Sequence, residues 1–157
     1  MQVTDRNPTV DDILHVATHM RTADIAECMA MGERNLVDVL TDGVRRSVWS
    51  RAVLIDGVPA CILGVAPYGA LLTATSGVPW MLGTDLVPQN RRALIRTAPL
   101  YIDDMLRTFS HLLNFVHADN TLAVRWLRRV GFTMHEAQPV GVNGAMFHCF
   151  EMRSPRV

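Results

Sequence analysis

The sequence predicts an α+β fold, in which one mixed central sheet carries helices on both faces. Two observations lead to this prediction. Apolar runs bounded by turn residues alternate with segments of helical periodicity, and two pairs of runs meet at hairpin turns, Asp56-Gly57 and Asn143-Gly144. Hairpins join antiparallel strands, whereas a helix between two strands allows a parallel crossover, so both kinds of pairing are expected in one sheet.

The expected elements follow from apolar periodicity and from the residues that start and stop each segment. Thr9 is an N-cap with Asp12 in the first turn, and Asn120 caps a later helix that stops at Gly131. In chain order we expect a strand ending at 3–4, helices over 10–20 and 24–40, strands over 48–55, 58–65 and 78–87, a helix over 91–109, a strand over 112–116, a helix over 121–130, and strands over 132–140 and 145–152.

Four glycine or proline positions modify these elements. Gly32 is expected to break the second helix, and Gly43 to end it. Pro99 either kinks the helix over 91–109 or marks a new helix capped by Thr97. Gly83 lies inside a strand, where a glycine indicates a bulge or the close approach of a ligand or of another backbone.

The composition is that of one globular domain over residues 1–157. Hydrophobic residues make up 49% of the chain and charged residues 19%, which excludes a disordered protein. No apolar run reaches the roughly 18 residues of a membrane span. The N-terminus lacks the apolar core of a signal peptide, so we expect a cytoplasmic protein without a membrane partner.

Charge and cysteine content exclude further classes. The 15 basic residues are all Arg and balance 15 acidic residues, so no overall field attracts nucleic acid. Arg makes forked contacts to phosphate, although a GC-rich genome explains the absence of Lys equally well. Cys28, Cys61 and Cys149 lie far apart in sequence, which is typical of buried, reduced thiols.

Two resemblances depend on the second half of the chain. The run from Asn120 through Ala123 to Gly131-Phe132 resembles the GNAT superfamily of N-acetyltransferases, in which an Asn-x-x-Ala helix leads into a Gly-Phe strand start. This resemblance implies an acyl-CoA N-acyltransferase fold, with acetyl-CoA as cofactor if the protein is an enzyme. The segment from Trp80 to Phe132 is similar to the internal virion protein A family of short-tailed coliphages. That likeness implies other phage virion proteins or a second copy as partners, and a location in the virion or the host cytoplasm.

The predicted cofactor loop departs from the GNAT pattern. The family has Arg/Gln-x-x-Gly-x-Gly/Ala after the fourth strand, because small residues let backbone N–H groups reach the pyrophosphate at a helix start. Here Arg92 and Leu94 stand where the small residues belong, and we expect their side chains to crowd a diphosphate. In the alternative, arginines meet the phosphates from outside. The candidate cofactor-binding residues are Gly83, Val87, Arg91, Arg92, Arg96 and Asn120.

The candidate catalytic residues are few. Leu127 occupies the position where many GNAT members carry a general-acid Tyr. Asp85 is a candidate base, directly or through water, although an ordinary Asp has a pKa near 3.9 and equally well caps a turn or pairs with Arg. His117 is either a proton carrier near the cleft or a polar loop residue. His15 and His19 share a helix face, but no third ligand follows at recognisable spacing, so no metal site is expected.

Three hypotheses follow. The altered loop and the missing Tyr favour a phage virion or virion-assembly protein that uses the acetyltransferase fold as a scaffold without a cofactor. The alternative is an N-acetyltransferase that transfers an acetyl group from acetyl-CoA to an amine. A nucleic-acid binder using Arg125, Arg128 and Arg129 is the third. The first two are distinguished by whether the cleft between the fourth and fifth strands is open or filled by side chains.

Overall fold

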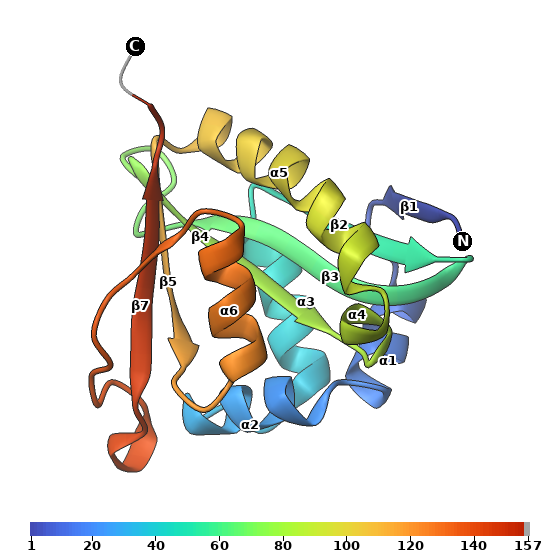
Figure 1. Ribbon diagram of the computed structural model, residues 1–157, viewed down its shortest axis with the longest axis horizontal. Coiled ribbons are helices and arrows are strands. Elements are labelled where there is room, and N and C mark those ends of the chain that lie inside the picture. The colour runs from blue at the N-terminus through green and yellow to red at the C-terminus, as the bar shows by residue number, and fades with distance from the viewer. Residues whose placement is uncertain (156–157) are drawn as a thin grey trace.

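A computed structural model, which describes residues 1–155, places one seven-stranded sheet at the centre of the molecule (Figure 1). The strands are β1 (Val3–Arg6), β2 (Trp49–Ile55), β3 (Val58–Pro67), β4 (Ser76–Gly83), β5 (His111–His117), β6 (Thr133–Met134) and β7 (Phe147–Arg153). Their order across the sheet is β1-β2-β3-β4-β5-β7-β6, in which β4 and β5 are parallel and the other neighbours antiparallel. The predicted mixed sheet is therefore confirmed.

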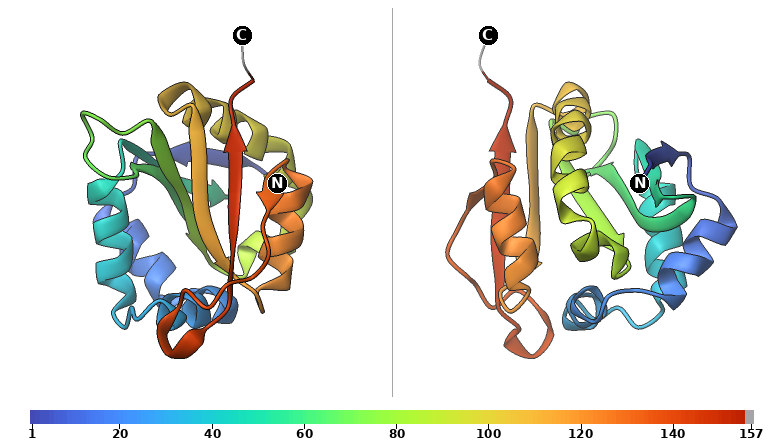
Figure 2. Two further views of the ribbon diagram at one scale, coloured as in Figure 1. Left: turned by 90° about the vertical axis from the view of Figure 1, so that its left-hand side faces the viewer. Right: turned by 45° about the vertical axis from the view of Figure 1, so that its right-hand side comes forward.

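Helices cover both faces of the sheet (Figure 2). They are α1 (Val10–Thr18), α2 (Thr22–Ala30), α3 (Leu36–Arg46), α4 (Leu86–Gln89), α5 (Arg91–Thr108) and α6 (Thr121–Arg129), with a 3-10 turn, η1 (Val142–Gly144). The apolar stripes of α5 and α6 pack on one face, where Leu63, Val65 and Leu112 are buried. Those of α1 to α3 pack on the other face, against Ala52 and Ile62. Alternate residues of each strand therefore point to opposite faces of the sheet and contribute to two separate cores.

The predicted start signals are confirmed, and so is the break expected at Gly32. Thr9 and Asp12 form a capping box, and Asp56 and Gly57 both have positive φ at the β2–β3 turn. Gly32, whose φ is +88°, separates the segment expected over 24–40 into two helices, as predicted. Gly43 does not end α3, which continues to Arg46. A glycine at this position lets the Trp80 ring pack closely against α3, because a methyl group at Gly43 would lie 3.0 Å from the ring.

The strand expected over 78–87 is wrong at its end. β4 stops at Gly83, and Leu86–Gln89 forms the short helix α4. The β3–β4 register of the described residues shows no bulge at Gly83. The close approach predicted there comes from another backbone, because Arg21 N donates to the Gly83 carbonyl at 2.9 Å. Pro99 lies within one continuous α5, so no new helix begins at Thr97.

The last hairpin is shorter than expected. Asn143 and Gly144 have the positive φ values that the turn requires. However, β6 holds only Thr133–Met134, and residues 135–146 form a long connection before β7 that meets the sheet again through an isolated bridge between Gln138 and Phe147. The prediction of a single domain stays a prediction, and residues 156 and 157 lie outside the described residues. No helix of residues 1–155 is both long and apolar enough to cross a membrane.

Candidate functional site

The sheet splits between its two parallel strands. β4 and β5 are paired only at Ser76–His111 and Gly77–Leu112, and then diverge (Figure 1). One further link crosses the opening, where Asn114 Nδ2 of β5 donates to the Pro79 carbonyl of β4 at 2.8 Å. Beyond this link the two strands are too far apart for a ladder, so the sheet contains a wedge-shaped gap.

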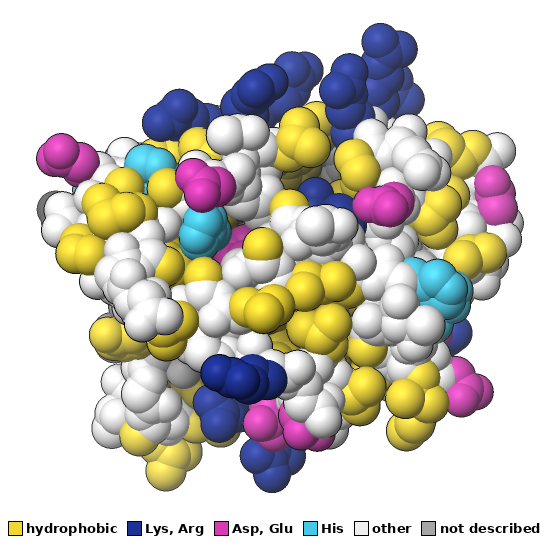
Figure 3. Space-filling model, turned by 90° about the horizontal axis from the view of Figure 1, so that it is seen from below, with side chains coloured by type: hydrophobic (Ala, Val, Ile, Leu, Met, Phe, Trp, Pro, Cys, Tyr) yellow, Lys and Arg dark blue, Asp and Glu magenta, His cyan; other side chains and the backbone are white. Residues whose placement is uncertain are grey.

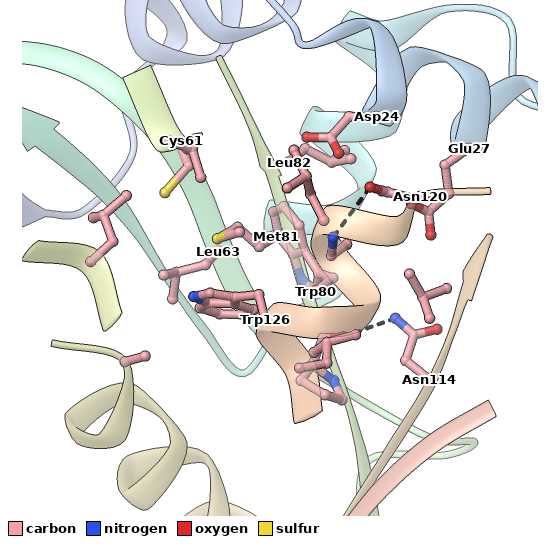
Figure 4. A pocket seen from close by; sticks show the side chains of 18 of the residues that line it. Asp24, Glu27, Cys61, Leu63, Trp80, Met81, Leu82, Asn114, Asn120 and Trp126 are labelled. Carbon is pink, nitrogen blue, oxygen red and sulfur yellow. Dashed lines mark hydrogen bonds between the residues drawn. The ribbon is translucent and has the colours of Figure 1, made fainter. Parts of the chain in front are cut away.

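A cavity of about 1120 Å³ fills this gap. It is lined by α5 and α6 on one face of the sheet, by α2 and α3 on the other, and by β3, β4 and β5 between them. Figure 4 shows Leu63, Met81 and Trp126 around this space. The volume exceeds the range of about 300–1,000 Å³ typical of small-molecule sites, so the cavity can accept a large, elongated ligand.

The predicted blockage of the cleft is wrong. Leu94 is only 8% exposed and packs in the core beneath α5, in helical register with Ala98, Ile102 and Met105. Arg92 lies on the opposite face of the helix, where it is exposed at the cavity rim. Both residues line the cavity, and it remains open because Leu94 packs into the core and Arg92 extends at the rim.

Basic side chains border the cavity on the α5–α6 side. Three come from the start of α5 and two from α6; they are Arg91, Arg92, Arg96, Arg125 and Arg129. None of the five forms a salt bridge within residues 1–155, in contrast to Arg21, which is paired with Asp24. Unpaired guanidinium groups on both sides of one opening favour a ligand with several phosphates.

The start of α5 adds backbone donors to this rim. Asn90 does not cap the helix with its side chain, because its Nδ2 donates back to the Leu86 carbonyl at 2.9 Å. Among the described residues, the N–H groups of Arg91 and Arg92 have no acceptor. Free N–H groups at a helix start attract anions through the helix dipole. This end of the cavity can therefore bind phosphate without the usual glycines.

A partly buried carboxylate lines the other end of the cavity. Glu27 of α2 accepts the backbone N–H of His117 at 3.1 Å and Nδ2 of Asn120 at 2.9 Å. Burial raises the pKa of Glu27 above its ordinary value, nearby Asp24 raises it further, and the two hydrogen bonds oppose the shift. A carboxyl group with a raised pKa in a cleft is the usual form of a general acid or base.

Asp24, one turn earlier on α2, has a different environment. It forms a buried ion pair with Arg21 and accepts the N–H of Gly83 at 2.9 Å. Asp24 therefore holds the last residue of β4, while Glu27 holds the last residue of β5. We call these two carboxylates the α2 bridge, because they connect the separated ends of the two strands (Figure 4).

The predicted site residues divide into two groups. Val87, Arg91, Arg92, Arg96 and Asn120 line the cavity, although their role in cofactor binding stays a prediction. Gly83 and Asp85 are not among the lining residues. Gly83 is packed between Val87 and Cys61, where a side chain would clash. Asp85 is exposed beyond the end of β4, because the strand stops four residues earlier than predicted.

The sequence reasoning missed Glu27 and part of the arginine rim. Glu27 falls at the start of the helix expected over 24–40, and nothing in the sequence reveals its partial burial. Arg125 and Arg129 line the cavity but Arg128 does not, so the expected basic stripe on α6 is divided. His117 contributes its backbone N–H to Glu27, while its ring makes an edge contact with Phe147.

Metal and thiol chemistry find no support in residues 1–155. The rings of His15 and His19 stack on each other, and no group of three or more His, Cys, Asp or Glu is arranged to hold a metal ion. Burial raises the pKa of Cys28 to about 11 and that of Cys61 to about 12. Neither thiol forms the thiolate needed of a nucleophile near neutral pH.

We compared the sequence and the fold with those of known proteins. No family model matches the sequence, and no curated protein matches it. Among solved structures, yncA from Salmonella typhimurium, solved with its cofactor acetyl-CoA, superposes with a TM-score of 0.75 over 99% of this chain and 95% of its own, at 12% identity. The chain has the GNAT acetyltransferase fold. Ribosomal-protein-alanine N-acetyltransferase from Brucella melitensis gives a TM-score of 0.72 at 14% identity over 96% of this chain and 99% of its own. At these identities the likeness establishes the GNAT fold alone.

Proposed function

We propose that this protein is an N-acyltransferase that transfers an acetyl group from acetyl-CoA to an amine. The observation that carries the proposal is the open cavity between β4 and β5, which has phosphate-binding groups at one end and the partly buried carboxylate of Glu27 at the other. The structural neighbours support the reaction class, since several are named as N-acetyltransferases and two were solved with acetyl-CoA.

The residues present fit acetyl-CoA. Its pyrophosphate and 3′-phosphate match the arginines and the free N–H groups at the start of α5. Its narrow pantetheine arm matches the apolar walls formed by Leu63, Met81 and Trp126. When bound, acetyl-CoA would supply an acetyl thioester with a good leaving group. The chain itself supplies the positioning of that group and the handling of protons.

Glu27 is the residue best placed to act as the base. An amine arrives mostly as an ammonium ion, which must lose a proton before its nitrogen can attack. Burial raises the pKa of Glu27 toward the range in which a carboxylate accepts a proton efficiently. The His117 N–H and Asn120 Nδ2 hold both carboxylate oxygens, so the group is oriented before an acceptor binds.

The scaffold hypothesis has less support. It depended on side chains that fill the cleft, whereas Leu94 is in the core and Arg92 is at the rim. No feature of the described residues supports a role in a phage particle.

Thermal unfolding with and without coenzyme A tests the proposal. Saturating coenzyme A at about 100 times its dissociation constant stabilises a protein by about 2.7 kcal/mol. For a chain of this size, that corresponds to a Tm increase of about 5–10 °C. Arg92→Glu should abolish most of the increase, whereas Arg107→Glu, at the opposite end of α5 and outside the cavity, should leave it intact. No increase at millimolar coenzyme A would overturn the proposal.

A further inference from the structure

The half of the cavity on the α2–α3 side has an apolar, aromatic wall. It is formed by Cys28, Met31, Val39, Gly43, Trp80 and Leu82. The Trp80 indole rests against α3 at Gly43, where even a methyl group would lie 3.0 Å from the ring. Trp80 Nε1 also donates to Ser47 Oγ at 2.7 Å, which fixes the orientation of the ring. The floor of this half is therefore preformed.

The charges in the same half are acidic. Glu27 and Glu33 line it without a salt-bridge partner in residues 1–155, and Arg21 is neutralised by its buried pair with Asp24. The unpaired arginines of the cavity belong to α5 and α6. Figure 3 shows basic side chains along the upper edge of this face, and others below the hydrophobic side chains at its centre. Arg34 lines a separate depression with Ala17 and Thr18. A cation is thus favoured in the α2–α3 half.

The connection between β6 and β7 limits the size of what can enter. It packs directly on the end of α2: a methyl group at Gly141 would lie 2.7 Å from the Ala30 carbonyl oxygen, and one at Gly32 would lie 3.3 Å from Val142 Cγ1. An extended polypeptide cannot pass between these two segments. Met31, Glu33 and Val39 line the cavity beside this contact, which leaves less room for a polypeptide than for a small molecule.

We propose that the acceptor is a small primary amine on an aromatic or branched apolar skeleton, without a carboxylate next to the amine. This inference depends on the proposed function and names its acceptor. The apolar skeleton lies against Trp80, and the ammonium group faces Glu27. Glu27 takes one proton from the ammonium; the nitrogen then bonds to the thioester carbonyl carbon, the carbon–sulfur bond breaks, and sulfur leaves with the second proton as the thiol.

Three acceptors test this specificity by release of free thiol from acetyl-CoA. They are phenethylamine, phenylalanine, which adds only a carboxylate beside the same amine, and a hexapeptide with a free N-terminus. We expect kcat/KM for phenethylamine to exceed the other two by about 100-fold, because an unpaired carboxylate near Glu27 and a polypeptide at the closed entrance are both disfavoured. Equal or faster turnover of phenylalanine or the peptide would overturn the inference.

A binding measurement separates this inference from the proposed function. Phenethylamine is titrated calorimetrically into the protein saturated with coenzyme A. Val39→Trp places an indole in the acceptor half and should weaken phenethylamine at least about tenfold, while the coenzyme A-induced Tm increase remains. The control Val10→Trp lies on α1, is 71% exposed in the native chain, and should change neither value.

The outcomes are distinct. Loss of the coenzyme A effect in the wild-type chain contradicts the proposed function. A retained coenzyme A effect without phenethylamine binding or turnover contradicts the acceptor inference alone. Binding that Val39→Trp does not weaken contradicts the location of the acceptor against α3.

Discussion

The two ends of the β4–β5 gap are held by different interactions. At the closed end, backbone pairing joins Ser76 to His111, and side chains continue the link: Ser76 Oγ lies 2.9 Å from His111 Nδ1, and His111 Nε2 lies 2.8 Å from Glu151. At the open end no ladder remains, and the strand ends are connected by the α2 bridge, Asp24 and Glu27, together with the Arg21 N–H that donates to the Gly83 carbonyl. The width of the cavity therefore depends on two carboxylates of a single helix.

Those two carboxylates differ in their partners. Asp24 has a buried guanidinium beside it, so its charge is compensated inside the protein. Glu27 has only neutral donors, and burial raises its pKa. The same helix thus provides one carboxylate suited to holding structure and one suited to exchanging a proton. Variants of the two residues should separate stability from activity.

The largest expected effect is on stability, from Asp24→Ala. The variant leaves Arg21 buried without its partner and removes the acceptor of the Gly83 N–H. Breaking a buried ion pair by removing one partner costs about 3–5 kcal/mol. Urea unfolding measures the change. As a control, Asp42→Ala removes the partner of exposed Arg45 and should cost no more than about 1 kcal/mol. Equal losses for the two variants would show that the Asp24 contact does not hold the gap.

The second effect is on catalysis, from Glu27→Gln. Gln keeps the shape of the side chain but cannot accept a proton, so kcat should fall about 100-fold or more. The coenzyme A-induced Tm increase should persist, because Glu27 is remote from the arginine rim. Glu136→Gln, at an exposed site, is the matched control. Unchanged kcat in Glu27→Gln would remove Glu27 from the mechanism.

The pH dependence of the wild-type chain sharpens this comparison. Because the pKa of Glu27 lies above its ordinary 4.5, folded Glu27 retains a proton where the unfolded chain has released it. The free energy of unfolding should therefore fall as pH rises from 4.5 through the folded pKa, and kcat/KM should rise over the same range. Both dependences should be absent in Glu27→Gln. A flat wild-type stability in this range would contradict the raised pKa.

Sequence reasoning predicted the sheet, the caps and the turns better than the site, for a physical reason. Thr9, Asn120 and Asp56-Gly57 act through neighbours a few residues away, so their roles are local. Glu27 acts through His117 and Asn120, about ninety residues later, and its burial arises only when α2 crosses the gap. Arg92 and Leu94 were misjudged because the loop motif says nothing about how α5 is rotated. That rotation is set by the apolar stripe, which was present in the sequence.

A third, smaller effect concerns the closed end, through Gly77→Ala. An added methyl group would clash with the Phe109 ring and lie 2.8 Å from Val65 Cγ2, next to the last backbone pair between β4 and β5. Overpacking of this kind costs about 1–3 kcal/mol. Adding Phe109→Leu should relieve part of that cost, so the double variant should be more stable than the sum of the single losses predicts. Strict additivity in urea unfolding would contradict the clash.

The smallest expected effect comes from Glu151, which joins His111 and His135 at the closed end. Its hydrogen bond from His111 is the main cause that lowers the pKa of Glu151 below 4.5, and His135, 3.2 Å away, adds to the shift. A lowered folded pKa gives stability that is present above pH 4.5 and lost as pH falls through the folded value. Because Glu151 is near the surface, Glu151→Gln should lower Tm by only about 2–4 °C at neutral pH, and this difference should shrink in acid. If the difference instead stayed constant in acid, the closed end would depend on the shape of the Glu151 side chain rather than its charge. The closed and open ends would then differ in kind, because only the open end would be held by charge.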